Sequence, residues 1–166
     1  MAKTDLFKES PAFLQQLPRG AFLTVSDSKE RNTMTIGWGS IGYMWQKPVI
    51  MVMVRYSRYT HHLMQQAPDF TLSLPVDDNL KSELGAAGSK SGRDGDKFDA
   101  LGLTPQPGHR TASPVIAGGG LHYECRIVYR QPMKAEDLDP EICSQMYGDD
   151  DLHVLYFGEI LDCYRD

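Results

Sequence analysis

The sequence predicts a mainly β fold, an antiparallel barrel of about six strands with two or three short helices attached. Strand-length apolar segments do not alternate regularly with helices, and the glycine-rich motifs that open the common nucleotide-binding α/β folds are absent. We expect a single domain over residues 1–166, because 41% apolar and 23% charged residues in a chain of this length can bury one core.

The first strands are predicted to form a hairpin. Residues 20–26 and 32–43 are rich in β-formers and glycine, and the polar residues 27–31 between them favour a turn. Residues 49–54 are continuously apolar, which predicts a strand buried on both faces.

Short helices flank the next strand. Ser57 can cap a helix that stops near residue 67, and a second helix is expected over residues 78–87. Residues 69–76 alternate between apolar and hydroxyl side chains, which predicts a strand between the two helices.

The second half of the chain begins with a long loop. Residues 88–120 are dense in glycine, proline and charge, so most of this segment should be ordered surface loop. Residues 121–130 alternate strictly and are the clearest strand, with an apolar face and a polar face. A helical turn over residues 140–147 precedes the last strand, residues 152–164.

Charge and cysteine content disfavour several classes of protein. The net charge is -5, so no basic field attracts nucleic acid or an anionic membrane. The longest apolar run, residues 49–54, is too short for a membrane span or an export signal. Cys125, Cys143 and Cys163 are odd in number and form no Cys-x-x-Cys pair, which favours the reducing cytoplasm and argues against a zinc or dithiol site.

The densest polar cluster is residues 55–60, where a buried strand is followed by a helix. Its two arginines, Arg55 and Arg58, together with the hydroxyls of Ser57 and Thr60 and the helix N–H groups, suit a phosphate monoester dianion. The same residues also fit a capped helix with solvent-facing arginines.

A second unusual stretch is residues 32–39. In a strand, Thr33, Thr35 and Gly37 share one face, which leaves accessible backbone where a flat ring system could approach, with Met34 and Trp38 beside it. A Thr-rich edge strand with a glycine bulge is the alternative interpretation.

The loop over residues 89–98 supplies hydroxyls, cations and glycines. It could fold over an anionic ligand, with Lys97 reaching a phosphate as a point charge and with Ser89, Lys90 and Ser91 nearby. A solvated, mobile loop is the alternative.

Single residues support fewer conclusions. His153 follows three aspartates and could act as an acid or base, although a solvent-exposed histidine in a turn is the simpler interpretation. His61 and His62 are adjacent on a helix and cannot face one metal ion, so we predict no metal there. Cys125 lies on the apolar face of its strand, which predicts a buried, inert thiol.

These stretches together resemble the flavin reductase-like, FMN-binding split-barrel family, especially its flavoredoxin-like members, over about residues 18–162. The matching pieces are Asn32-Thr33-Met34-Thr35-x-Gly37-Trp38, Ser57-Arg58-Tyr59-Thr60-x-x-Leu63, Gly88-Ser89-Lys90-Ser91-Gly92-Arg93-Asp94-x-Asp96-Lys97-Phe98, Leu121-x-Tyr123-x-Cys125 and His153-x-x-x-x-Gly158-Glu159. Relatives often carry Gly-Asp-His before the last strand, whereas here Leu152 precedes His153.

The resemblance implies a six-stranded Greek-key split barrel that forms a homodimer, with FMN near the dimer interface. It places the flavin ring beside Thr33, Met34 and Thr35, and it includes Asn32 among the cofactor-binding residues. It assigns the phosphate end to Arg55, Ser57, Arg58 and Thr60, covered by Ser89, Lys90, Ser91 and Lys97. His153 would lie near the ring, where a nicotinamide or another electron partner enters.

Three functions are compatible with these residues. The first is an oxidoreductase in which NADH or NADPH passes hydride to the flavin, which then reduces free flavin or another acceptor. The second is a flavoredoxin-type electron carrier without NAD(P)H activity, whose acidic residues 136–151 would steer a basic redox protein. The third is a module that binds haem or a non-redox metabolite.

Overall fold

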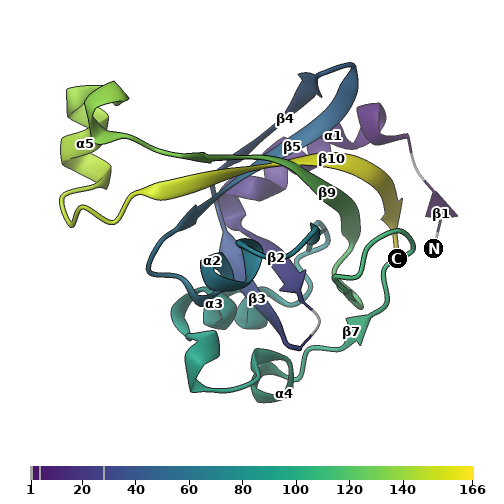
Figure 1. Ribbon diagram of the computed structural model, residues 1–166. Coiled ribbons are helices and arrows are strands. Elements are labelled where there is room, and N and C mark those ends of the chain that lie inside the picture. The colour runs from purple at the N-terminus through teal and green to yellow at the C-terminus, as the bar shows by residue number, and fades with distance from the viewer. Residues whose placement is uncertain (1, 4, 28) are drawn as a thin grey trace.

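The computed structural model describes residues 2–3, 5–27 and 29–166, and one curved antiparallel sheet dominates it (Figure 1). The order of the strands in this sheet is β3-β2-β6-β9-β10-β5-β4, and β1 pairs with β10. The strands are β1 (Ala2–Lys3), β2 (Ala21–Ser26), β3 (Arg31–Ile36), β4 (Gly39–Met44), β5 (Lys47–Arg55), β6 (Asp69–Leu74), β9 (Leu121–Pro132) and β10 (His153–Arg165).

Short elements surround this sheet. β7 (Pro105–Gln106) and β8 (Val115–Ile116) form a separate two-stranded sheet. The helices are α1 (Leu6–Gln16), α2 (Tyr59–Met64), α3 (Lys81–Ser89), α4 (Lys97–Leu101) and α5 (Pro140–Met146), with 3-10 turns η1 (Leu17–Arg19), η2 (Gly92–Asp94) and η3 (Ala135–Asp137). The predicted mainly β, antiparallel class with short helices is confirmed.

The main sheet contains more strands than the sequence predicts. The segment 32–43, expected as one strand, is divided at Gly37 and Trp38 into β3 and β4, and β1 is additional. β3 pairs with β2 at one end of the sheet, whereas β4 pairs with β5 at the other end. The corner at residues 37–38 therefore carries the chain from one end of the curved sheet to the other, and among the described strands no pairing joins these two ends.

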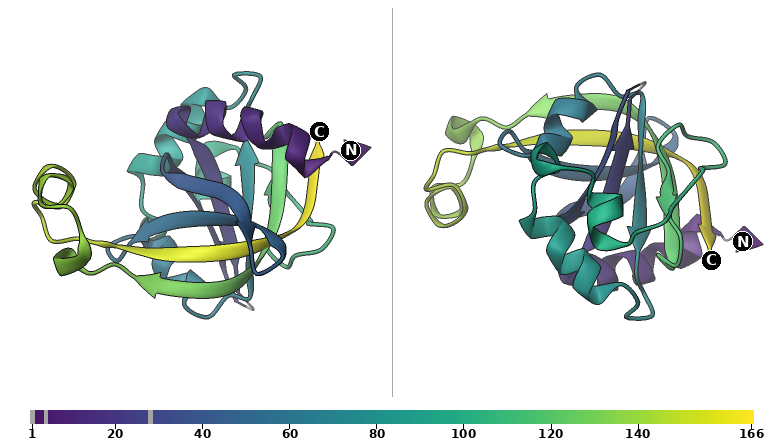
Figure 2. Two further views of the ribbon diagram at one scale, coloured as in Figure 1. Left: turned by 90° about the horizontal axis from the view of Figure 1, so that it is seen from above. Right: turned by 90° about the horizontal axis from the view of Figure 1, so that it is seen from below.

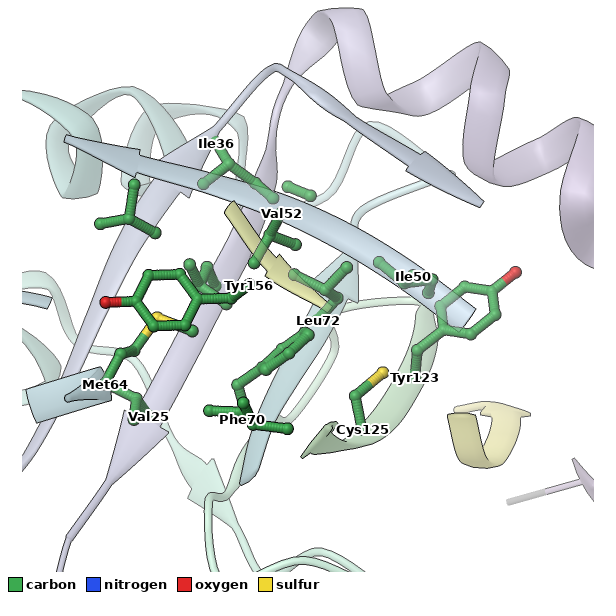
Figure 3. Packing of buried hydrophobic residues seen from close by; sticks show 14 of the residues in the cluster. Val25, Ile36, Ile50, Val52, Met64, Phe70, Leu72, Tyr123, Cys125 and Tyr156 are labelled. Atoms are coloured by element: carbon green, nitrogen blue, oxygen red, sulfur yellow. The ribbon is translucent and has the colours of Figure 1, made fainter. Parts of the chain in front are cut away.

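The core fills the concave side of the curved sheet. Ile50 and Val52 of β5, Phe70 and Leu72 of β6, and Tyr156 of β10 are all buried there (Figure 3). β5 is less buried than predicted, because only alternate residues near its end point into the core. Met53, on the other face, is partly exposed and becomes important below.

The predicted alternation of β9 is only half correct. Its apolar face is buried from Leu121 to Ile127, including Cys125, whose thiol pKa is raised by burial, whereas Tyr129 at the end of that face is 44% exposed. His122 and Glu124 on the other face are also fully buried. The segment before β9 covers them, and the Glu124 carboxylate accepts hydrogen bonds from the backbone N–H groups of His109, Arg110 and Thr111 at 2.6–3.0 Å.

The helices differ from the sequence prediction in two places. α1 was not predicted; it begins after Asp5, whose carboxylate accepts a hydrogen bond from Phe7 N, and lies along one side of the barrel (Figure 2). The expected cap at Ser57 is wrong, because α2 begins after Arg58 and the Ser57 hydroxyl bonds elsewhere.

α5 stands apart from the barrel at the far end of the long β9–β10 hairpin (Figures 1 and 2). A second small cluster of buried side chains, including Phe22 of β2 and Phe98 of α4, fixes α3 and α4 to the sheet. No helix in the described part of the chain is both long and apolar enough to cross a membrane.

Candidate functional site

Two clefts lie around the junction between β5 and α2, and Arg58 lines both. The first, the polar cleft, has a volume of about 240 Å³ and is lined by Asn32, Ser57, Arg58, Tyr59, Thr60, Ser89, Lys90, Ser91, Gly92, Arg93 and Lys97. The second, the strand cleft, has a volume of about 270 Å³ and is lined by Met34, Thr35, Ile36, Gly37, Trp38, Met53, Arg55, Arg58 and His153.

Lys97 forms a buried cationic wall of the polar cleft. Its ammonium group donates to the carbonyl oxygens of Thr33 at 2.9 Å and Ala87 at 2.8 Å, and the residue is only 4% exposed. Burial, with a smaller effect from the Arg58 charge, lowers the pKa of Lys97 to about 8. An ammonium group has three donors, so one remains for a ligand in the cleft.

Arg58 connects the two clefts. Its guanidinium donates to the carbonyl oxygen of Gly88 at 2.9 Å, which ties the start of α2 to the end of α3. Burial lowers the pKa of Arg58, and the charge of Asp151 opposes this effect. A guanidinium presents five donors in a planar fork, so Arg58 keeps most of its donors for an anion.

The floor of the polar cleft is rigid. Asn32 Nδ2 donates to Thr60 Oγ1 at 2.9 Å, and both residues are almost fully buried. Gly92 packs directly on this floor, because a Cβ atom there would lie 2.4 Å from Asn32 Oδ1 and 2.5 Å from Tyr59 Cδ1. Only glycine allows the loop to approach so closely.

The loop over residues 89–93 is held across the polar cleft. Ser91 accepts a hydrogen bond from the Arg93 N–H at 3.2 Å and caps η2. The Arg93 guanidinium donates to the carbonyl oxygen of Ser57 at 2.9 Å and lies over the Tyr59 ring. These contacts favour an ordered loop over a solvated, mobile one.

His153 is buried at the base of the strand cleft. It is 7% exposed, so the interpretation of His153 as a solvent-exposed turn residue is wrong. Its Nδ1 lies 2.7 Å from the hydroxyl of Tyr147, and its ring lies 5.5 Å from that of Trp38. Burial, together with the nearby Arg55 charge, lowers the pKa of His153 to about 4, so the imidazole is neutral at pH 7.

Arg55 and Thr33 were expected at the ligand, but their polar groups have other partners. Arg55 lies in the strand cleft and donates to the Asp149 carboxylate and to the carbonyl oxygens of Met146 and Asp151, which anchors the end of α5. Thr33 is fully buried and lines neither cleft; its hydroxyl donates to the carbonyl oxygen of Leu23.

The structure nevertheless brings most predicted site residues together. The polar cleft gathers Asn32, Ser57, Arg58, Thr60, Ser89, Lys90, Ser91 and Lys97, and the strand cleft gathers Met34, Thr35, Arg55 and His153. The predicted set lacks Tyr59 and Arg93, which lie inside motifs already recognised, and Met53. Met53 was not predicted at the site, because β5 was expected to be buried on both faces.

Comparisons with known proteins show the family of the chain. The flavin reductase like domain family matches residues 14–166, and the chain belongs to this family. An uncharacterised protein of Archaeoglobus fulgidus is 28% identical over 154 residues, which cover 90% of this chain and 76% of the relative.

Two solved structures share the fold. The flavoredoxin of Desulfovibrio vulgaris (Miyazaki F) is 26% identical, with a TM-score of 0.70 over 89% of this chain and 69% of the other. A protein from Shewanella frigidimarina with a split barrel domain is 17% identical, with a TM-score of 0.68 over 98% of this chain and 75% of the other. The split-barrel class is therefore confirmed.

The residues present fit a flavin mononucleotide. The ligand has an anionic phosphate at one end and a flat ring system at the other. The polar cleft offers the cations Arg58 and Lys97, whereas the strand cleft offers Met34, Trp38 and backbone beside Gly37. Because Arg58 lines both clefts, one elongated ligand can span them.

Proposed function

We propose that the protein is an FMN-dependent oxidoreductase that takes hydride from NADH or NADPH and passes electrons to free flavin or another acceptor. Family membership supports a flavin-linked function. The observation that carries the proposal is the junction at Arg58 between a cationic cleft and a flatter, less polar cleft. The bound flavin would supply the redox chemistry, and the protein would supply orientation and electrostatics.

The chain's own residues have distinct roles in this proposal. Arg58, Lys97 and Lys90 hold the phosphate dianion through charge-assisted hydrogen bonds. Met34 and Trp38 shield the ring, and backbone groups beside Thr35 contact its polar edge. Neutral His153 borders the position of the ring and can exchange hydrogen bonds with a second reactant without adding a charge.

The competing function is a flavoredoxin-type electron carrier without its own NAD(P)H activity. The solved flavoredoxin at 26% identity favours this candidate. Six acidic residues are exposed around α5, which stands apart from the barrel (Figure 1): Glu136, Asp137, Asp139, Glu141, Asp149 and Asp150. Such a surface would steer a basic redox protein.

One spectroscopic experiment separates the two functions. The protein is reconstituted with FMN, desalted, and its visible spectrum is recorded without oxygen before and after NADH and then NADPH. Retained flavin that bleaches rapidly supports the oxidoreductase and identifies the preferred nicotinamide. Retained flavin that bleaches only through a reduced partner protein supports the carrier.

The same preparation tests whether flavin is the ligand at all. Arg58→Ala removes a cation shared by both clefts, so FMN affinity should fall by about 1.5–3 kcal/mol, the usual cost of losing a hydrogen bond to a charged group. An unchanged FMN affinity in this variant would favour the third class, a module for haem or another metabolite.

A homodimer is part of the same proposal, and an exposed aromatic patch supports it. Trp45 at the β4–β5 turn is 54% exposed and lies 6.1 Å from both Tyr129 and Phe157, measured between ring centroids. Burying such rings against a second copy of the chain is favourable. Analytical ultracentrifugation should show a dimer, and Trp45→Ser should shift it towards monomer; a wild-type monomer would contradict this part.

None of the three cysteines forms a disulfide, which supports a reducing compartment such as the cytoplasm as the place where the protein works.

A further inference from the structure

Asp151 accepts hydrogen bonds from both donor groups of Ser57, a residue that lines the polar cleft. The Ser57 N–H donates to Asp151 Oδ1 at 3.2 Å, and the Ser57 hydroxyl donates to Asp151 Oδ2 in a short hydrogen bond. Ser57 lines the polar cleft, where a phosphate would seek such donors. A hydroxyl carries a single hydrogen, so Ser57 cannot donate to Asp151 and to a ligand at the same time.

The position of Asp151 is fixed by the turn before β10. Its backbone N–H donates to Asp149 Oδ1 at 3.2 Å, and its carbonyl oxygen accepts from Arg55 at 2.9 Å. Asp150 adopts a left-handed conformation with φ of 58°, which directs the chain between its two neighbours. The backbone of this turn therefore holds the Asp151 carboxylate next to Ser57.

The Asp151 charge also acts on the cationic end of the site. Its electrostatic effect opposes the burial that lowers the pKa of Arg58, and it has the same effect on His61 and His153. A negative charge felt at Arg58 disfavours a phosphate dianion at the same guanidinium, because like charges repel across a partly buried site.

We propose that Asp151 is a specificity-determining residue that lowers the affinity of the site for the phosphate of FMN. It does so by occupying the donors of Ser57 and by opposing the charge of the dianion. FMN then exchanges with solution more readily than it would from the same cleft without Asp151. This inference rests on the proposed flavin function.

The experiment compares FMN with riboflavin, which lacks the phosphate. Both ligands are titrated into the flavin-free protein, and the ratio of the two affinities isolates the contribution of the phosphate. Asp151→Asn keeps the shape of the side chain but removes its charge, and it leaves one acceptor oxygen, so the side chain can hold only one of the two Ser57 donors. The FMN-to-riboflavin ratio should rise by about fivefold, the size of one screened charge interaction at a partly exposed site.

Asp150→Asn is the matched control. It removes the same charge from the adjacent position, Asn tolerates a left-handed conformation, and the Asp150 side chain forms no hydrogen bond or ion pair with any described residue. Its FMN-to-riboflavin ratio should stay within about twofold of the wild-type ratio, because an exposed, unpaired charge has a small effect.

Ser57→Ala provides an independent test if Asp151→Asn does not fold. If Asp151 already occupies the hydroxyl, this variant should change FMN affinity by less than about twofold. If Ser57 bonds the phosphate directly, FMN affinity should fall by about tenfold.

Separate outcomes contradict the inference and the proposed function. An unchanged or lower FMN-to-riboflavin ratio in Asp151→Asn, or the tenfold loss in Ser57→Ala, overturns the role of Asp151 while flavin binding stands. Absence of binding of either flavin to the wild-type protein overturns the flavin function and the inference with it.

Discussion

Lys97 should make FMN binding depend on pH in the range just above neutrality. Its ammonium is buried, and the pKa falls from 10.5 to about 8, which corresponds to about 3 kcal/mol of destabilisation of the charged form. The folded pKa is below the unfolded value, so between pH 8 and 10.5 the unfolded chain binds more protons. The stability of the ligand-free protein attributable to Lys97 should therefore rise with pH in this window.

Phosphate binding should show the opposite trend. The phosphate of FMN is dianionic above pH 7 and favours the charged ammonium. With a pKa of about 8, Lys97 is about 90% charged at pH 7 and about 10% charged at pH 9. FMN affinity should therefore fall by up to about tenfold between these two pH values, whereas riboflavin affinity should not follow this profile.

Lys97→Met is the informative variant, because it keeps the length of the side chain without the charge. Ligand titrations at pH 7 and pH 9 should show weaker FMN binding and no loss between the two pH values. Urea unfolding at pH 8 and pH 9.5, taken as wild type minus variant, cancels the other titrating groups and measures the stability trend. A flat wild-type FMN profile, or equal pH profiles in wild type and Lys97→Met, would refute the reasoning.

Three further predictions concern stability and are measured by denaturant unfolding. Glu124→Gln should cost about 2–4 kcal/mol near pH 7, because three partly buried N–H donors would lose a carboxylate partner. Burial raises the pKa of Glu124, but the hydrogen bonds from Tyr164 and the backbone outweigh it and lower that pKa, so the stabilisation is lost as the pH falls below 4.5. A constant difference in stability between wild type and variant down to about pH 3 would argue against this role. Gly158→Ala should cost about 1–3 kcal/mol of stability, because a Cβ atom there would lie 2.6 Å from Phe70 Cζ. The control Gly42→Ala, whose Cβ would have no atom within 4 Å, should cost less than about 0.5 kcal/mol. Equal losses in the two variants would contradict the close packing at Gly158. Folding lowers the pKa of His153 from 6.5 to about 4, so the neutral imidazole stabilises the folded protein above pH 6.5 and this stabilisation is lost as the pH falls through 4. Between pH 6.5 and pH 4, the free energy of unfolding of His153→Gln should therefore fall less than that of the wild type.

Local patterns in the sequence predict much of the fold and the polar half of the site. Strict alternation in β9 and a cluster of arginines and hydroxyls after β5 are local signals, and both lie where expected. Polar residues buried by distant segments could not be predicted in this way. Glu124 is on the polar face of its strand by pattern, yet residues 109–111 cover it and supply its hydrogen-bond donors.

Asp151 and Arg55 show the same limitation at the site. A run of aspartates before the last strand is most simply a solvated turn, and arginines beside a serine most simply suggest phosphate. Only the pairing of β5 with β10, which places His153 opposite Arg55, brings these aspartates to Ser57 and Arg55. A carboxylate and a phosphate accept hydrogen bonds from the same kinds of donor. The sequence alone therefore does not show to which anion a given N–H or hydroxyl donates.

The open sheet explains why the strand cleft lies where it does. β3 forms one end of the hydrogen-bonded path, so among the described strands its outer edge has no partner. Alternate residues of an antiparallel strand direct their backbone groups to opposite sides, and Lys97 already bonds the outward carbonyl of Thr33. Thr35 is two residues after Thr33 in β3, so its backbone groups also face this outer edge, next to Gly37 and Met53. A sheet closed between β3 and β4 would use these groups internally, so the opening supplies the backbone donors and acceptors that a flat, polar-edged ring needs.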